Sequence, residues 1–130
     1  MNLRAFLYWT TTALVALPLV MGGLAHFTLD PTMVENMRSM GYSESFMRIL
    51  GLWKILAAPA LLIPGAARLK EFAYAGVFFL LTGAAYSHYA AGHGLGGAAP
   101  ALVILCLAFA SYLLRPASRA LGGAVLPEAG

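Results

Sequence analysis

Four long apolar segments dominate the chain. They run over residues 5–27, 46–64, 72–91 and 99–114, and the last is the shortest. A helix needs about 20 apolar residues to cross the hydrocarbon core of a bilayer, so each segment is a candidate transmembrane helix. Because most connections between them are short, consecutive helices are expected to be antiparallel neighbours. The pattern predicts an all-α protein, an integral membrane four-helix bundle that forms one transmembrane domain over residues 1–130.

The connection between the first two segments carries helix signals of its own. Asp30 suits an N-cap and Pro31 suits the first helical position. Thr32 and Glu35 have the spacing of a capping box, which offers an alternative start two residues later. Gly41 can end the helix. Three methionines recur at helical spacing: Met33, Met37 and Met40. We expect a short amphipathic helix on the outer membrane surface or, as the alternative, a lid over the end of the bundle.

The first apolar segment also resembles a secretion signal in one respect. Arg4 precedes it, and Gly23 and Ala25 have the small side chains of a cleavage site. The run over residues 5–27 is, however, longer than the ~7–15 apolar residues of a typical signal core. We therefore expect a retained first helix.

The composition agrees with a lipid environment. Hydrophobic residues make up 61% of the chain and charged residues 10%, against about 45–50% and 25% in soluble domains. The formal net charge is +3, but the basic residues are scattered and form no stripe that would indicate a nucleic-acid partner. The expected environment is the lipid bilayer, specifically a bacterial inner (plasma) membrane.

The basic residues also indicate orientation. Five of them lie beyond the segment ends on one side, and two lie on the other side. The first group is Arg4, Arg68, Lys70, Arg115 and Arg119, and the second is Arg38 and Arg48. Since cytoplasmic loops carry the excess of Lys and Arg, both termini are expected in the cytoplasm. The residues from 121 to 130 contain Gly and Pro and are expected to fray.

Lys54 lies midway along the second apolar segment. A lysine at the bilayer centre costs about 2.5–3.5 kcal/mol, and such residues usually face the bundle interior and hold a partner. Lys54 is eight residues from Phe46, about 12 Å along a helix that rises ~1.5 Å per residue. Its side chain spans only about half of that distance. An internal partner or a functional role is therefore a better explanation than snorkelling to the surface.

Candidate partners for Lys54 lie in the outer half of the predicted bundle. His26 closes the first helix, and Tyr86 and His88 lie in the outer part of the third. Asp30 and Glu35 lie above them in the connection. Together these residues could line an outward-facing polar pocket for a ligand. Helical spacing puts Tyr86 and His93 on one face of the third helix and His88 on another, so both histidines face one pocket only if the helix end unwinds.

Cofactor and redox motifs are sparse. A membrane histidine can be a proton relay, a haem ligand or a hydrogen-bond donor, so quinone and haem stay open as cofactors. There is no HxxxH or HExxH pair, and we expect no metal site. The single cysteine, Cys106, excludes dithiol chemistry within the chain. Gly76, Gly83 and Ser87 have the small-residue spacing that permits close helix contact.

Several stretches together resemble the DoxX-like family of small four-helix integral membrane proteins. They are MGY at 40–42, LGLWKIL at 50–56, LIPG at 62–65, RLKEFAYAG at 68–76, SH at 87–88 and LRP at 114–116. The resemblance covers nearly the whole chain and implies a four-helix membrane bundle. Relatives are linked to quinone-coupled sulfur oxidation and membrane oxidoreductase complexes, and others resemble chaperones for membrane receptors. Cys106 counts against a role that needs paired thiols.

Three functions follow as hypotheses. The first is an accessory membrane subunit that binds a lipophilic molecule, such as a quinone, or a membrane protein partner through the outward-facing pocket. The second is a membrane enzyme, an isomerase or a quinone-linked oxidoreductase, that acts on a small lipophilic substrate. The third is a chaperone for another membrane protein. Because so small a bundle has few helix faces to cover one another, a homo-oligomer is also expected.

Overall fold

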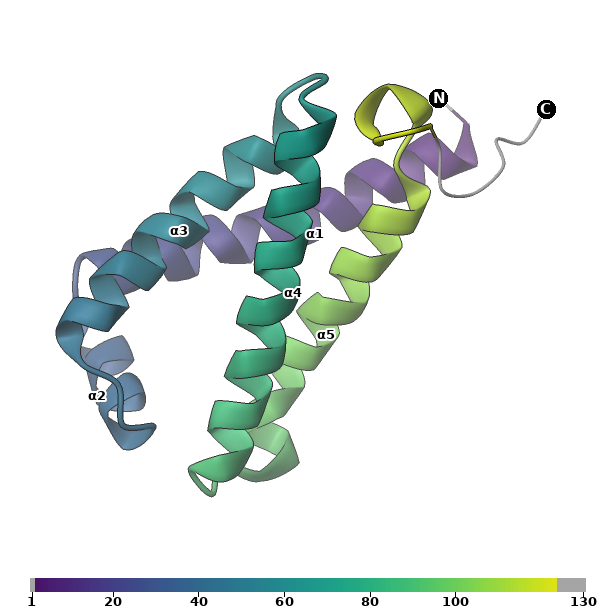
Figure 1. Cartoon of the computed structure of the whole chain (residues 1–130). Helices are drawn as coiled ribbons and strands as arrows, with labels where there is room; N and C mark the ends of the chain where they lie inside the picture. Colours follow the sequence, from purple (N-terminus) through teal and green to yellow (C-terminus); the bar gives the residue numbers. More distant parts are fainter. Residues whose placement is uncertain (1, 124–130) are drawn as a thin grey trace.

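The structure is a computed structural model that describes residues 2–123. In it the chain forms five α-helices and one short 3₁₀ helix (Figure 1). The helices are α1 (Leu3–Phe27), α2 (Pro31–Ser39), α3 (Glu44–Leu62), α4 (Ala67–Ala90) and α5 (Gly94–Leu114), followed by η1 (Ala117–Arg119). Within the described residues there is no strand, which confirms the all-α prediction. Most of the tail that was expected to fray lies outside the described residues.

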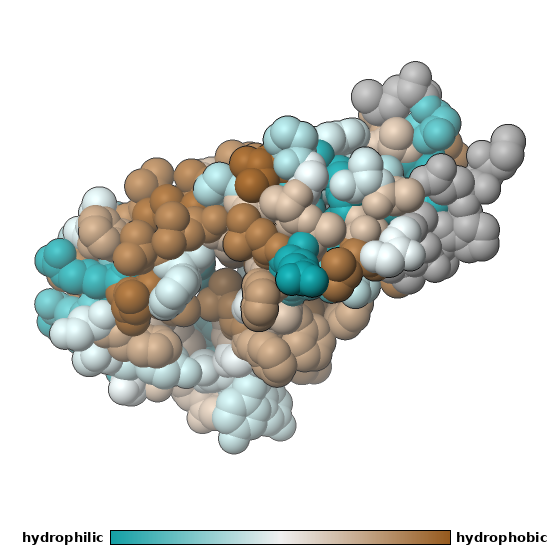
Figure 2. Space-filling model, turned by 45° about the horizontal axis from the view of Figure 1, so that its top comes forward, coloured by the Kyte–Doolittle hydropathy of each residue, from teal (hydrophilic) through white to brown (hydrophobic). Residues whose placement is uncertain are grey.

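Three of the helices, α1, α3 and α5, are long and apolar enough to cross a membrane. The sequence predicted a fourth span, but α4 is not among the three although it has 24 residues. It begins five residues earlier than expected and so includes Arg68, Lys70 and Glu71, and its last turns carry Tyr, Ser and His. Large apolar side chains such as Trp53, Phe72 and Phe79 are exposed, and hydrophobic surface is extensive in Figure 2. These features indicate an integral membrane protein associated with the lipid bilayer.

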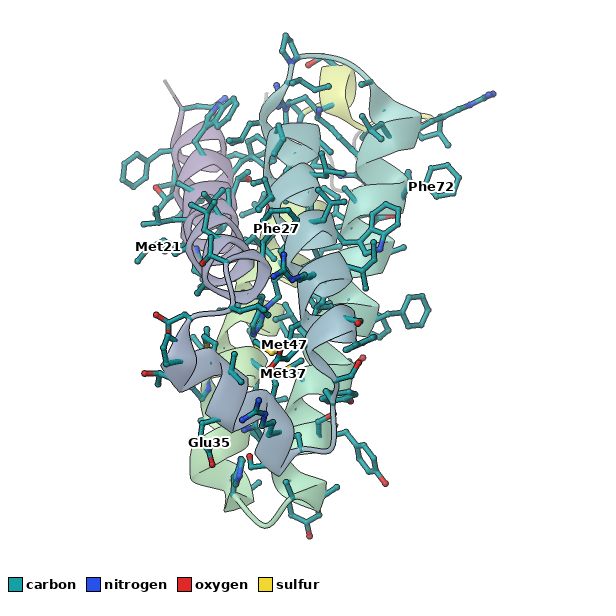
Figure 3. All side chains as sticks on the ribbon, turned by 90° about the vertical axis from the view of Figure 1, so that its left-hand side faces the viewer. Met21, Phe27, Glu35, Met37, Met47 and Phe72 are labelled. Atoms are coloured by element: carbon teal, nitrogen blue, oxygen red, sulfur yellow. The ribbon has the colours of Figure 1, made fainter. Side chains whose placement is uncertain are left out.

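The short helix α2 forms where the sequence predicted it. The Asp30 carboxylate accepts hydrogen bonds from the backbone N–H groups of Thr32 and Met33, at 3.1 and 3.3 Å. The start at Pro31 is thereby confirmed over the alternative start two residues later. Gly41, at φ +85°, turns the chain out of the helix. Met37 of α2 and Met47 of α3 are both buried, whereas Phe72 projects away from the helices (Figure 3).

The helices pack through a close contact between α1 and α3. A Cβ atom added to Gly51 would lie only 2.6 Å from the Gly23 carbonyl oxygen and 2.6 Å from the Phe27 nitrogen. The two backbones can approach this closely because neither glycine has a side chain. The small residues singled out on α4 do not serve this purpose within the chain, since a Cβ atom at Gly76 or Gly83 would meet nothing within 4 Å.

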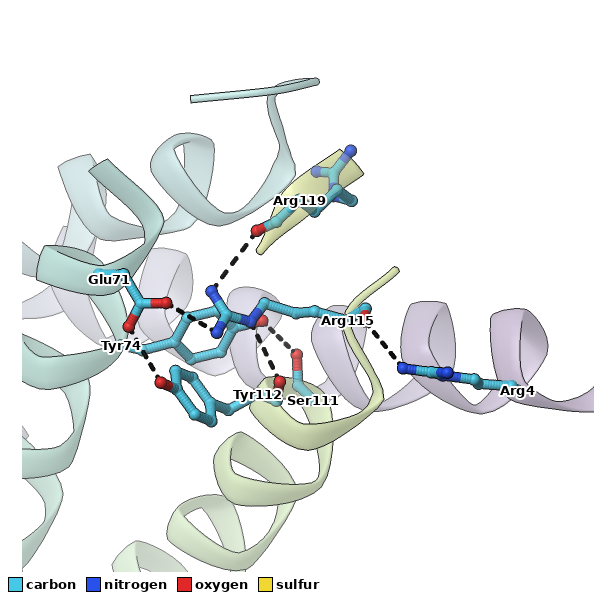
Figure 4. A network of polar contacts seen from close by, with 7 residues as sticks. All are labelled: Arg4, Glu71, Tyr74, Ser111, Tyr112, Arg115 and Arg119. Carbon is cyan, nitrogen blue, oxygen red and sulfur yellow. Dashed lines mark hydrogen bonds and ion pairs between the residues drawn. The ribbon is translucent and has the colours of Figure 1, made fainter. Parts of the chain in front are cut away.

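A buried polar network joins the start of α1, the end of α5 and the loop between α3 and α4 (Figure 4). The Arg115 guanidinium, 1% exposed, donates to Glu71 at 2.8 Å, and the Tyr112 hydroxyl also donates to that carboxylate. Arg119 donates to the Tyr8 hydroxyl at 2.8 Å. We call this set the terminal polar network: Tyr8, Thr12, Lys70, Glu71, Tyr74, Ser111, Tyr112, Arg115 and Arg119.

The terminal polar network also caps the C-terminus of α3. Arg119 donates to the carbonyl oxygens of Leu61, Leu62 and Ile63 at 3.0, 2.8 and 2.9 Å. Lys70 donates to the carbonyl of Ala60 at 3.2 Å and to that of Ile63. The last carbonyls of a helix lack intrahelical partners and carry partial negative charge. Arg119 and Lys70 therefore supply hydrogen-bond donors to these carbonyls. The sequence analysis had used both residues only to predict the orientation in the membrane.

Gly51→Leu is predicted to destabilise the protein by more than about 2 kcal/mol, because the new side chain must separate two packed backbones. Gly76→Leu, which adds a side chain into open space, is the matched control and should leave stability nearly unchanged. Thermal unfolding in detergent micelles measures both. Equal stability of the two variants would contradict the close α1–α3 contact.

Arg119→Met is predicted to cost about 2–4 kcal/mol, because it leaves buried carbonyls at the end of α3 and the Tyr8 hydroxyl without their cationic donor. Arg48→Met removes an exposed arginine of α3 and should cost less than about 0.5 kcal/mol. The comparison uses the same unfolding measurement. If both variants unfold like the unmodified protein, the network does not stabilise the fold.

Candidate functional site

Lys54 contacts a histidine across the α1–α3 interface. Its Nζ lies 3.0 Å from Nδ1 of His26, in the last turn of α1. The two meet because α1 and α3 approach closely at Gly23 and Gly51, one turn away from each. Gly22 leaves room beside the ammonium, since a Cβ atom there would lie 3.7 Å from Nζ. The structure therefore gives Lys54 an internal partner, as the sequence analysis expected.

The Lys54–His26 pair lies at the wall of a cavity of about 400 Å³. Four helices form its walls and α2 covers part of it. Most lining side chains are apolar, among them Leu19, Met37, Leu50, Phe79, Leu80 and Ile104. The volume falls within the range of about 300–1,000 Å³ that is usual for small-molecule pockets. Figure 2 shows a hollow between hydrophobic surfaces on the face that it draws. We call this space the central cavity.

The polar groups of the central cavity are few. Besides Lys54 and His26 they include His88 and the joined pair Tyr42 and Ser87, whose hydroxyl oxygens lie 2.6 Å apart. That pair connects the loop after α2 to α4. Apolar walls with a small number of placed polar groups are typical of sites that bind a lipophilic body by one polar end.

His88 and His93 meet where the sequence pattern had separated them. Helix α4 ends at Ala90, and Gly92, at φ +83°, reverses the chain. The Nδ1 atoms of the two rings then lie 2.8 Å apart, and Nε2 of His93 lies 3.3 Å from the Ser39 hydroxyl of α2. The helix end does leave the helical path, which brings the two rings together, but His93 does not line the central cavity as His88 does. This contact joins α2 to the turn between α4 and α5.

The structure brings three of the five candidate residues to one cavity. Lys54, His26 and His88 line it. Tyr86 does not line it, and its side chain is 72% exposed. Glu35 also lies outside the central cavity, on the exposed side of α2 (Figure 3). Sequence reasoning missed Tyr42 as a lining residue, although it directly follows the glycine that ends α2.

A second cavity, of about 330 Å³, lies between α4 and α5. Its polar members are already hydrogen-bonded: Tyr112 and Arg115 both donate to Glu71, and the Tyr74 hydroxyl lies 2.6 Å from that of Ser111. It is therefore continuous with the terminal polar network. Among residues 2–123, no three His, Cys, Asp or Glu side chains gather in an arrangement that could hold a metal ion. The central cavity remains the candidate ligand site.

Comparison with known proteins identifies the family. Neither the curated proteins nor the solved structures contain a match to this chain. A family model, that of the DoxX-like family, matches residues 10–111. The matched region includes every residue that lines the central cavity and ends before Arg115 and Arg119. The match covers well over half of the 130 residues, and the chain therefore belongs to the DoxX-like family.

Proposed function

We propose that the protein is a non-catalytic accessory membrane subunit that binds a lipophilic molecule, such as a quinone, in the central cavity. The observation that carries this proposal is the polar pair Lys54–His26 at the wall of a largely apolar cavity of about 400 Å³. The apolar walls suit a hydrocarbon body. The Lys54 ammonium donates hydrogen bonds only, which suits an oxygen acceptor on the ligand.

Access from the bilayer supports a lipophilic ligand over a water-soluble one. Phe79 lines the cavity and is 71% exposed, so the cavity wall continues onto the outer surface of α4. In a membrane that surface faces acyl chains. A molecule dissolved in the lipid then reaches the cavity sideways, between the helices, without passing through water.

The proposed membrane arrangement uses α4 as the fourth span, antiparallel to its neighbours. The ends of the helices divide into two groups in Figure 1: the start of α1, the α3–α4 loop and η1 at one end, and α2 with the α4–α5 turn at the other. The first end carries the larger share of Lys and Arg, which supports a cytoplasmic location for it and for both termini. The central cavity then opens in the outer half of a bacterial inner membrane, beneath α2.

An enzyme is the second candidate, favoured by the direct contact between an amine and an imidazole in the same cavity. Such a pair can move a proton to or from a bound substrate if the substrate reaches within hydrogen-bond distance. An isomerase or a quinone-linked oxidoreductase would use it so. The accessory role is the simpler proposal, because ligand binding alone accounts for apolar walls with a few polar groups.

Gly22→Leu is predicted to weaken ligand binding at least tenfold by filling the space beside Lys54. The probes are decyl-benzoquinone and hexadecanol, added to the full chain in a neutral detergent and followed by calorimetry. Gly76→Leu is the matched control, since it adds the same side chain away from the cavity, and should bind like the unmodified protein. Absence of binding by both probes, or binding that Gly22→Leu leaves intact, would contradict the proposal.

The proposed orientation predicts different labelling of two single cysteines. In a Cys106→Ser background, Glu35→Cys on α2 should react with a membrane-impermeant maleimide added to intact cells. Pro64→Cys in the α3–α4 loop should react only after the membrane is permeabilised. Both positions are exposed, so burial in the fold does not account for a difference. The reverse pattern would place α2 in the cytoplasm.

A further inference from the structure

The charge of Lys54 has no carboxylate partner in the described chain. Residues 2–123 contain four acidic side chains, and none of them lines the central cavity: Asp30, Glu35, Glu44 and Glu71. Three are engaged elsewhere, because Asp30 caps α2, Glu44 pairs with Arg38 at 2.8 Å and Glu71 pairs with Arg115 at 2.8 Å. The fourth is exposed on α2. A cation held in a low-dielectric site without a counter-ion destabilises the protein.

His26 does not supply the missing negative charge. The Lys54 ammonium is a donor only, so the Nδ1 atom of His26 accepts its hydrogen bond. A neutral imidazole that accepts at Nδ1 carries its hydrogen on Nε2 and can donate from there. No residue of the described range accepts a hydrogen bond from that Nε2. The pair therefore presents N–H groups from both side chains and no acceptor, which is the pattern that an anionic oxygen requires.

We propose that the ligand of the central cavity is a lipophilic anion, a long-chain carboxylate whose head group binds Lys54 and His26. This inference rests on the proposed function, since it names the class of lipophilic molecule that the cavity takes. The carboxylate supplies the counter-ion that Lys54 lacks among residues 2–123 and accepts charge-assisted hydrogen bonds. The hydrocarbon chain lies along the apolar wall formed by Leu50, Leu80 and Ile104. Phe79 lies at the exposed edge of that wall. It marks the side on which the hydrocarbon chain of the ligand enters from the bilayer.

The test compares two ligands that differ only in head-group charge, hexadecanoate and hexadecanol. Both are titrated into the full chain in a neutral maltoside detergent at about pH 8, where the carboxylate is ionised. The unmodified protein is expected to bind hexadecanoate at least tenfold more tightly than hexadecanol. This comparison needs no variant, so a folding defect cannot obscure it.

Two variants then locate the anion. Lys54→Met is expected to remove the preference for hexadecanoate, so that the two ligands bind with about equal affinity. Arg48→Met removes a cation from the same helix that does not line the cavity, and it should keep the full preference for hexadecanoate. A preference that survives Lys54→Met, or that disappears in Arg48→Met, would place the anion elsewhere and overturn the inference.

The two proposals fail in different ways. Equal affinity of the unmodified protein for hexadecanoate and hexadecanol, with both lost in Gly22→Leu, overturns the anionic ligand and leaves the lipophilic site standing. Tighter binding of neutral decyl-benzoquinone than of hexadecanoate also overturns the anionic ligand, keeps the lipophilic site and favours a quinone. If neither hexadecanoate, hexadecanol nor the quinone binds, both the inference and the proposed function are wrong.

Discussion

The close contact of α1 with α3 at Gly23 and Gly51 is the constraint on which the rest of the site depends. Two backbones separated only by glycines hold their neighbouring side chains in a narrow range of positions. His26 follows Gly23 and Lys54 follows Gly51, each by three residues, so both polar groups lie within about one turn of this contact. The Lys54 side chain reaches Nδ1 of His26, 3.0 Å from its Nζ. Wider spacing would leave a lysine alone in an apolar environment.

The terminal polar network, at the end of the molecule opposite α2, holds the helices together although they enclose a cavity. The terminal polar network fixes the start of α1, the end of α3 and the end of α5 to one another through Arg115 and Arg119. With that end secured, α3 and α4 separate toward their other ends, as Figure 1 shows. The central cavity occupies the space between them, and α2 is held across it by the Tyr42–Ser87 and Ser39–His93 contacts. The helices are thus joined by hydrogen bonds at the terminal polar network and leave space for the central cavity at the end near α2.

The sequence predicted features that depend on local chemistry and missed those that depend on packing. Asp30 and Gly41 define α2 by their own backbone preferences, and Lys54 required a partner because of its cost in lipid. Hydropathy located α1, α3 and α5 but gave no sign that Arg115 and Arg119 fold back to cap α3. The small residues of α4 matched a contact motif but meet no other helix, whereas Gly23 and Gly51 make the close contact without such spacing. His88 and His93 appeared on different faces because helical spacing was extended past Ala90, where the helix ends.

The buried cations of the terminal polar network have oxygen acceptors within the protein, and Lys54 differs from them in this respect. Arg115 holds a carboxylate, while Arg119 and Lys70 hold the carbonyl oxygens of a helix end. Each is buried with acceptors that the chain itself provides, so stability alone accounts for its presence. Lys54 is held by one neutral ring at the wall of an apolar cavity. A methionine would fill that place at lower cost in lipid, and in the proposed function the acceptor for the positive charge is supplied by the bound ligand.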